Sequence, residues 1–84
     1  MNKHLIEIIN NWNPAELYPL LEDEYYPEIT KIQSFMDDSN DLTIHKLAAI
    51  IEYIFISAFT ENIVVNSFKE DCEKTAESIL RTNI

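Results

Sequence analysis

Carboxylates and tyrosines gather in one short stretch of this 84-residue chain, between residues 22 and 41. The stretch has seven acidic residues and one basic residue, Lys31, so it carries −6 of the net charge of −9. Tyrosine is a frequent interface anchor because its ring supplies contact area and its hydroxyl can form a hydrogen bond. The combination predicts a surface that binds a positively charged protein, and the simpler alternative is a pair of solvated loops. The residues assigned to this surface are Glu22, Asp23, Glu24, Tyr25, Tyr26, Glu28, Asp37, Asp38 and Asp41.

The same carboxylates do not form a recognised metal site. Asp37, Ser39 and Asp41 repeat the alternation of the first ligands of an EF-hand loop. However, Leu42 stands where that loop requires glycine, and Ala48 stands where it ends in glutamate. A weak Ca²⁺ or Mg²⁺ site at residues 22–24 is the remaining alternative, and a metal-dependent enzyme would need it. We expect neither a metal nor a cofactor.

Nucleophilic catalysis would have to use Cys72 together with a histidine and an acid. Cys72 lies on the apolar stripe of a predicted helix, and the chain has no glycine from which to build an oxyanion-binding turn. His4 and His45 are far apart and lack the spacing of zinc ligands. We therefore expect a core thiol, two surface histidines and no enzymatic activity.

The element that must organise these residues is a central helix over 42–60. Its apolar residues recur at helical spacing and cover more than half of its circumference, so neighbours must approach it from two sides. Asp41 or Thr43 is expected to cap its N-terminus. The predicted buried stripe is Ile44, Leu47, Ala48, Ile51, Ile54, Phe55, Ala58 and Phe59.

Three further helices are predicted to surround the central one. They cover residues 2–12, 27–37 and 67–81, with Pro27 opening the second and a capping box of Ser67 and Glu70 opening the last. Residues 18–28 form an irregular, proline-containing connection, and residues 62–66 form a short apolar link. The absence of glycine also favours helices over tight β-turns. The predicted fold is a single all-α domain over 1–84, a compact four-helix bundle-like unit with room for one core.

Charge and hydropathy exclude several classes of partner. A net charge of −9 disfavours direct binding to nucleic acid or to an anionic membrane surface. No apolar run reaches the roughly 18 residues that span a bilayer, since Glu52 interrupts the longest one. The N-terminal residues do not have the pattern of a signal peptide. We expect a cytoplasmic protein.

Trp12-Asn13-Pro14, Leu20-Leu21 and the run from Glu22 to Ile29 together resemble the YugE-like family of small bacterial helical proteins, a domain of unknown function. The resemblance extends to Ile54-Phe55 and to Cys72, so it covers most of the chain. Asn13 stands where that family has Asp, and Tyr26 stands where it has a second Asp. The resemblance implies a helical fold and no established activity.

A similarity of surface, and not of chain order, links Tyr25-Tyr26-Pro27 to the helical immunity proteins that neutralise colicin DNases. Those proteins also present adjacent tyrosines and a proline among acids, but after their second long helix, whereas here the tyrosines precede it. This analogy implies an immunity protein that covers a basic toxin domain such as a nuclease. The alternative is a non-enzymatic housekeeping domain, with a homodimer left open, in which Tyr25 packs on Trp12 as a structural corner.

Overall fold

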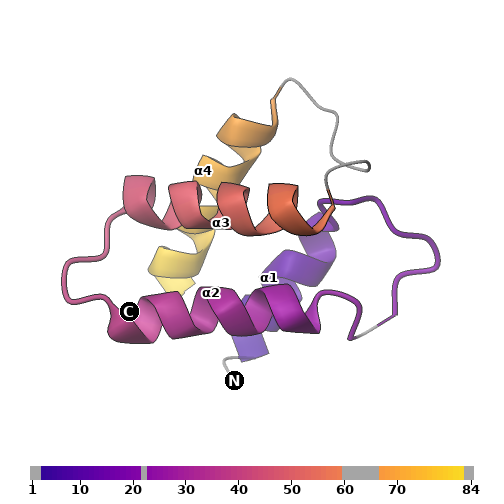
Figure 1. The fold of residues 1–84 in the computed structure, drawn as a ribbon, viewed down its shortest axis with the longest axis horizontal. Coiled ribbons are helices and arrows are strands. Elements are labelled where there is room, and N and C mark those ends of the chain that lie inside the picture. Colours follow the sequence, from indigo (N-terminus) through magenta and orange to yellow (C-terminus); the bar gives the residue numbers. More distant parts are fainter. Residues whose placement is uncertain (1–2, 22, 60–66, 83–84) are drawn as a thin grey trace.

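The computed structural model describes residues 3–21, 23–59 and 67–82, which form four helices and contain no strand (Figure 1). They are α1 (Lys3–Trp12), α2 (Tyr26–Asp38), α3 (Ile44–Ala58) and α4 (Phe68–Thr82). α2 and α3 run side by side in opposite directions, while α1 and α4 lie behind them in this view. α3 contacts α2 and α4, and α1 contacts the same two helices. The predicted all-α, four-helix architecture is confirmed.

The bounds of the helices follow local sequence signals. α2 begins at Tyr26, so Pro27 occupies the second helical position and not the first. Proline is tolerated there because the first turn has no intrahelical acceptor for its missing N–H. At α3, the Thr43 side chain accepts a hydrogen bond of 3.2 Å from the Lys46 backbone N–H, while Asp41 pairs with the Lys46 ammonium at 3.3 Å. Thr43 is therefore the cap, and the predicted link over 62–66 lies outside the described residues.

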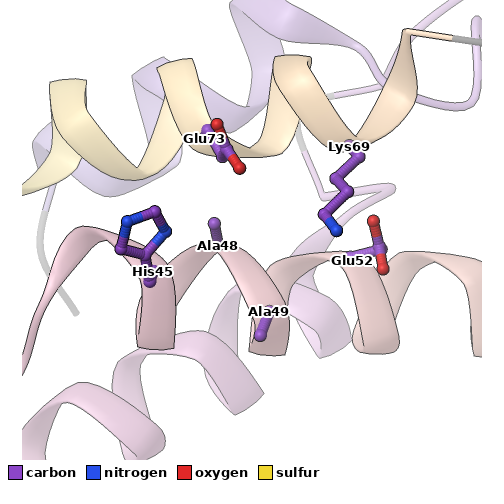
Figure 2. A pocket seen from close by; sticks show the side chains of 6 residues that line it. All are labelled: His45, Ala48, Ala49, Glu52, Lys69 and Glu73. Carbon is purple, nitrogen blue, oxygen red and sulfur yellow. The ribbon is translucent and has the colours of Figure 1, made fainter.

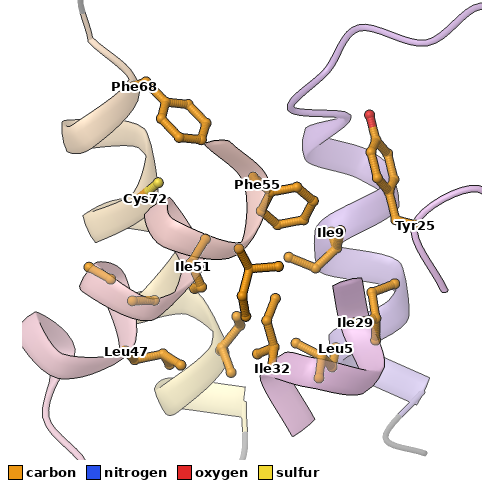
Figure 3. Close-up of a cluster of buried hydrophobic side chains, with 14 of the residues drawn as sticks. Leu5, Ile9, Tyr25, Ile29, Ile32, Leu47, Ile51, Phe55, Phe68 and Cys72 are labelled. Atoms are coloured by element: carbon orange, nitrogen blue, oxygen red, sulfur yellow. The ribbon is translucent and has the colours of Figure 1, made fainter. Parts of the chain in front are cut away.

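The core draws buried side chains from all four helices and from the connection between α1 and α2 (Figure 3). Burying each large apolar side chain stabilises the fold by roughly 1.5 to 3 kcal/mol, so the helices depend on one another for stability. The buried apolar residues are Leu5, Ile9, Ala15, Tyr25, Ile29, Ile32, Leu47, Ala48, Ile51, Ile54, Phe55, Phe68, Cys72, Ala76 and Ile79.

The predicted buried stripe of α3 is correct for the middle of the helix and wrong for its two ends. Leu47, Ile51 and Phe55 are fully buried. Ile44 and Ala58, the first and last residues of α3, are exposed. Periodicity places all of these residues on one face, but neighbouring helices cover that face only along its centre.

Aromatic rings join the C-terminal half of α3 to the rest of the core. Phe55 meets Trp12 of α1 and Tyr25 edge-on, with ring centroids 5.7 Å apart in each pair. It also stacks on Phe59 at 6.2 Å, and Trp12 in turn stacks on Phe68 of α4 at 5.7 Å. Such pairs contribute about 0.5 to 1.5 kcal/mol each beyond their buried area. Phe55 is thus the side chain through which three elements meet.

The connection between α1 and α2 is shaped by Asn13. This residue has φ 49°, and its backbone N–H donates to the Ile9 carbonyl at 2.9 Å, which ends α1 in the left-handed conformation that asparagine tolerates. Its side chain holds both backbone groups of Leu17, since Nδ2 donates to the carbonyl at 3.1 Å and Oδ1 accepts from the N–H at 3.0 Å. The peptide bond between Tyr18 and Pro19 is cis. One polar side chain therefore organises the turn that leads toward the acidic segment.

Candidate functional site

Tyr25 is a core residue, and its prediction as an exposed interface anchor is wrong. Its ring has 0% exposure and packs edge-on against Phe55 and Phe59. Its hydroxyl donates to Oδ1 of Asn13 and accepts from the Ala15 backbone N–H at 3.0 Å. Burial raises the pKa of the Tyr25 phenol above its ordinary value. The hydroxyl is therefore satisfied inside the protein and is not presented to a partner.

The corner that Tyr25 forms differs in one contact from the predicted one. The expected neighbour was Trp12, yet the ring contacts of Tyr25 are with Phe55 and Phe59. Trp12 packs on the same Phe55 ring and on Phe68. The two predicted partners thus meet through Phe55, because α3 supplies a large ring at the point where α1 and the connection approach it.

Tyr26, the next residue, is on the surface with 54% of its area exposed. It lines a shallow hollow of about 240 Å³ with Asp23, Ile6 of α1 and Ile29 of α2. The structure therefore brings together two predicted site residues, Asp23 and Tyr26, and adds two isoleucines. Neither isoleucine is a predicted site residue. In the first helix the apolar stripe is Leu5, Ile8, Ile9 and Trp12, and an isoleucine outside it, at position 6, is a signal that could have indicated the hollow.

Glu28 is the second predicted site residue that is buried, so its prediction as a surface residue is wrong. Only 7% of its area is exposed, and its Oε1 has no hydrogen-bond partner among the described residues. It lies one helical turn from both Tyr25 and Ile32, which are buried, so it falls on the inward side of α2. Its position early in the helix, which is favourable to the helix dipole, does not require exposure.

The remaining acids do not form one continuous surface. Asp23 and Glu24 are exposed before α2, whereas Asp37, Asp38 and Asp41 are exposed at its far end and in the loop that follows. A helix rises about 1.5 Å per residue, so the two groups are separated by roughly 20 Å (Figure 1). Asp37 also accepts a hydrogen bond of 2.9 Å from Gln33, and Asp41 pairs with Lys46. Glu22 lies outside the described residues.

A second concave site lies between α3 and α4, where no site was predicted (Figure 2). We call it the α3–α4 groove; it has a volume of about 290 Å³. His45, which was predicted to be a surface residue, is exposed and is part of its wall. The only sequence signal for the groove is helical spacing, which places residues 45, 49 and 52 on one side of α3 and residues 69 and 73 on one side of α4. This spacing indicates a shared site only once the packing of the two helices is known. The groove is lined by His45, Ala48, Ala49, Glu52, Lys69 and Glu73.

A metal centre is not supported in the described part of the chain. No group of three or more His, Cys, Asp or Glu side chains is arranged there to hold a metal ion. The alternative of a weak cation site at residues 22–24 includes Glu22, which lies outside the described residues.

Cys72 is confirmed as a core thiol. It is 1% exposed, and burial together with the charges of Glu52, Asp71 and Glu73 raises its pKa to about 12. Burial is the largest cause, because a thiolate loses its hydration inside the core. The nucleophilic form is therefore scarce at neutral pH.

We expect Cys72 of the folded protein to resist alkylation by iodoacetamide. The rise of its pKa from 9.0 to about 12 lowers the thiolate fraction at pH 8 by about a thousandfold. Since deprotonation increases with pH, the labelling rate should climb until the pH approaches 12. Mass spectrometry of quenched samples measures the rate, with the urea-unfolded protein as the control. Equal rates for folded and unfolded protein at pH 8 would contradict a buried thiol.

None of the described helices is both long and apolar enough to cross a membrane. Comparison with curated proteins and with solved structures gives no match. Residues 4–83 match the model of one protein family, whose description is "Domain of unknown function (DUF1871)". Because this match spans nearly the whole sequence, the chain belongs to the DUF1871 family.

Proposed function

We propose that this protein is a small acidic binding protein of the cytoplasm, and that it acts as an immunity protein that neutralises a basic toxin domain such as a nuclease. The observation that carries the proposal is the hollow in which Asp23 and the half-exposed Tyr26 adjoin Ile6 and Ile29. We also infer that the family grouping extends to the YugE-like proteins, because the run from Glu22 to Ile29 resembles their pattern.

The hollow suits the side chain of a lysine or arginine from the partner. Such side chains rest their methylene stems on apolar surface while the charged end stays near water or an acid. Here the partly exposed Ile6 supplies the apolar surface, next to the buried Ile29, and the Asp23 carboxylate supplies the opposite charge. The Tyr26 ring adds a face to which a cation is attracted. Binding of this kind blocks a cationic active-site surface without any catalysis.

Long-range charge would bring the two proteins together before the hollow is filled. A net charge of −9 attracts a basic partner and raises its association rate at low salt. Glu24, Asp37, Asp38 and Asp41 contribute to this field from exposed positions at both ends of α2. In this scheme the acids near Asp37 steer the partner, while Asp23 and Tyr26 make the close contact.

Purification of partners from the native cell, followed by binding kinetics on the isolated pair, tests the proposal. We expect a basic partner whose association slows markedly with added salt. Tyr26→Ala should raise the dissociation constant by about 30-fold, the effect of losing roughly 2 kcal/mol at an interface hot spot. Asp23→Asn should act in the same direction. Tyr53→Ala is the matched control, since Tyr53 is a tyrosine on α3 with 68% exposure outside the hollow. A salt-independent association rate, or equal effects of the two alanine variants, would count against the proposal.

The second candidate is a non-enzymatic housekeeping helical domain, with a homodimer left open. The burial of Tyr25 and Glu28 favours it, because two of the five residues of the Glu-Tyr-Tyr-Pro-Glu run then have a structural role. Sedimentation velocity separates the two candidates. A dimer that Tyr26→Ala dissociates supports self-association, whereas a monomer that binds a basic protein supports the first proposal.

A further inference from the structure

The α3–α4 groove combines charges of both signs around the methyl group of Ala48 (Figure 2). Ala48 and Ala49 of α3 both line the groove, and Figure 2 shows Ala48 directed toward α4 while Ala49 points to the other side of α3. The short Ala48 side chain leaves the space that the longer side chains surround. Glu52 rises from α3 beside the Lys69 side chain, which extends from α4 toward it. Glu73 comes from α4 one turn after Lys69 and points into the space above Ala48.

The charges of the groove are not used in close ion pairs of the described chain. The ion pairs found there join Lys46 to Asp41 and Arg81 to Glu77. Lys69 and Glu73 stand four residues apart, but lysine preceding glutamate is the less favourable order for such a pair on a helix. Glu52 and Glu73 are each half-buried. The groove therefore holds opposite charges that a ligand can bind.

The arrangement selects against ligands that carry one charge only. A simple amine attracted to Glu52 and Glu73 also meets the ammonium of Lys69, and a simple carboxylate attracted to Lys69 meets both glutamates. A like charge at close range costs binding energy and so gives specificity. A ligand with adjacent ammonium and carboxylate groups satisfies both signs. Because it is neutral overall, the charge of −9 on the protein does not repel it.

The volume of the groove further limits the size of the ligand that it can bind. Small-molecule sites usually occupy about 300 to 1,000 Å³, and the groove, at about 290 Å³, lies at the lower limit. Side chains four residues apart on a helix are neighbours, with Cβ atoms about 5 to 6 Å apart, so Lys69 and Glu73 suit two charges that are close together. We propose that the α3–α4 groove binds a free α-amino acid with a small aliphatic side chain. Its carboxylate binds Lys69, its ammonium binds Glu73, and its side chain lies on Ala48.

NMR titration of the full chain tests the ligand class with L-valine and its two single-charge analogues. Isobutylamine lacks only the carboxylate of valine, and isovalerate lacks only its ammonium. We expect valine to cause saturable shifts in the backbone amides of 45–52 and 69–73, with a dissociation constant on the order of 1 mM for so small a ligand. Either analogue should bind at least tenfold more weakly. The absence of saturable shifts, or isobutylamine binding as well as valine, would overturn the proposal.

Matched variants of α4 test the residues. Lys69→Gln and Glu73→Gln should each weaken valine binding at least tenfold. Lys74→Gln and Glu70→Gln remove the same charges from exposed positions of the same helix outside the groove, and they should leave the affinity unchanged. Circular dichroism confirms that all four variants are folded. If Glu70→Gln weakened binding as much as Glu73→Gln, net charge and not the groove would be responsible, and the assignment would be wrong.

Discussion

Replacing Phe55 with alanine is expected to lower the free energy of unfolding by about 4 kcal/mol, within the range for truncating a buried phenylalanine. Phe55 is fully buried and its ring contacts Trp12, Tyr25 and Phe59, so the substitution leaves a cavity where three elements meet. A small domain has only about 5 to 15 kcal/mol of net stability. The variant should therefore lose a large part of it, measured as a lower urea midpoint by circular dichroism.

The control for Phe55→Ala is Tyr53→Ala, an aromatic truncation two residues earlier on α3. Tyr53 is 68% exposed, and surface substitutions usually change stability by less than about 0.5 kcal/mol. Both substitutions replace an aromatic residue by alanine, which favours the helix to a similar extent, so the difference between them measures the loss of core packing. A decrease below 1 kcal/mol for Phe55→Ala would mean that the ring is not the junction described above.

Tyr25→Phe is expected to lower the free energy of unfolding by about 1 to 3 kcal/mol, the cost of leaving a buried polar group without its partner. The ring remains and fills the same space, but the Ala15 N–H loses the oxygen that accepts its hydrogen bond at 3.0 Å. Oδ1 of Asn13 loses a donor as well, although it keeps the Leu17 N–H. Chemical denaturation of the two proteins measures the difference.

Tyr26→Phe is the matched control for Tyr25→Phe. It removes the same hydroxyl from an exposed ring and should leave stability nearly unchanged. Combining Tyr25→Phe with Asn13→Ala should cost less than the sum of the single changes, because the two side chains share one hydrogen bond. If Tyr25→Phe and Tyr26→Phe proved equally stable, the role of Tyr25 as a structural corner would be refuted.

These results would show that Tyr25 and Tyr26 have different roles, one structural and one at the surface. Tyr25 holds the connection between α1 and α2 against α3, and Tyr26 remains available on the surface. Replacing both residues together, as a test of either binding or folding, would mix the two effects. Single substitutions are therefore the informative experiments for the proposed function.

The candidate site could be predicted only in part, because contacts between helices decide which of its residues are exposed and which of them lie close together. Residue types and charge indicated Asp23 and Tyr26, which the structure brings to one hollow. They also indicated Glu28, which is buried, and Asp37, which lies at the other end of α2. A run of acids in the sequence becomes one surface only if its backbone folds back on itself, and a helix of 13 residues separates its ends instead.

The sequence by itself determined the helices, because apolar periodicity and proline positions act over a few residues of chain. It also determined the burial of Cys72, since a residue on the apolar stripe of a helix faces the core. The structure decided that Thr43, and not Asp41, caps α3. Only the tertiary structure decided that Tyr25 is inside while Tyr26 is outside, and that Lys69 and Glu73 share a groove with Glu52. Both outcomes depend on the rotation and crossing of whole helices, which are set by packing between residues far apart in the chain.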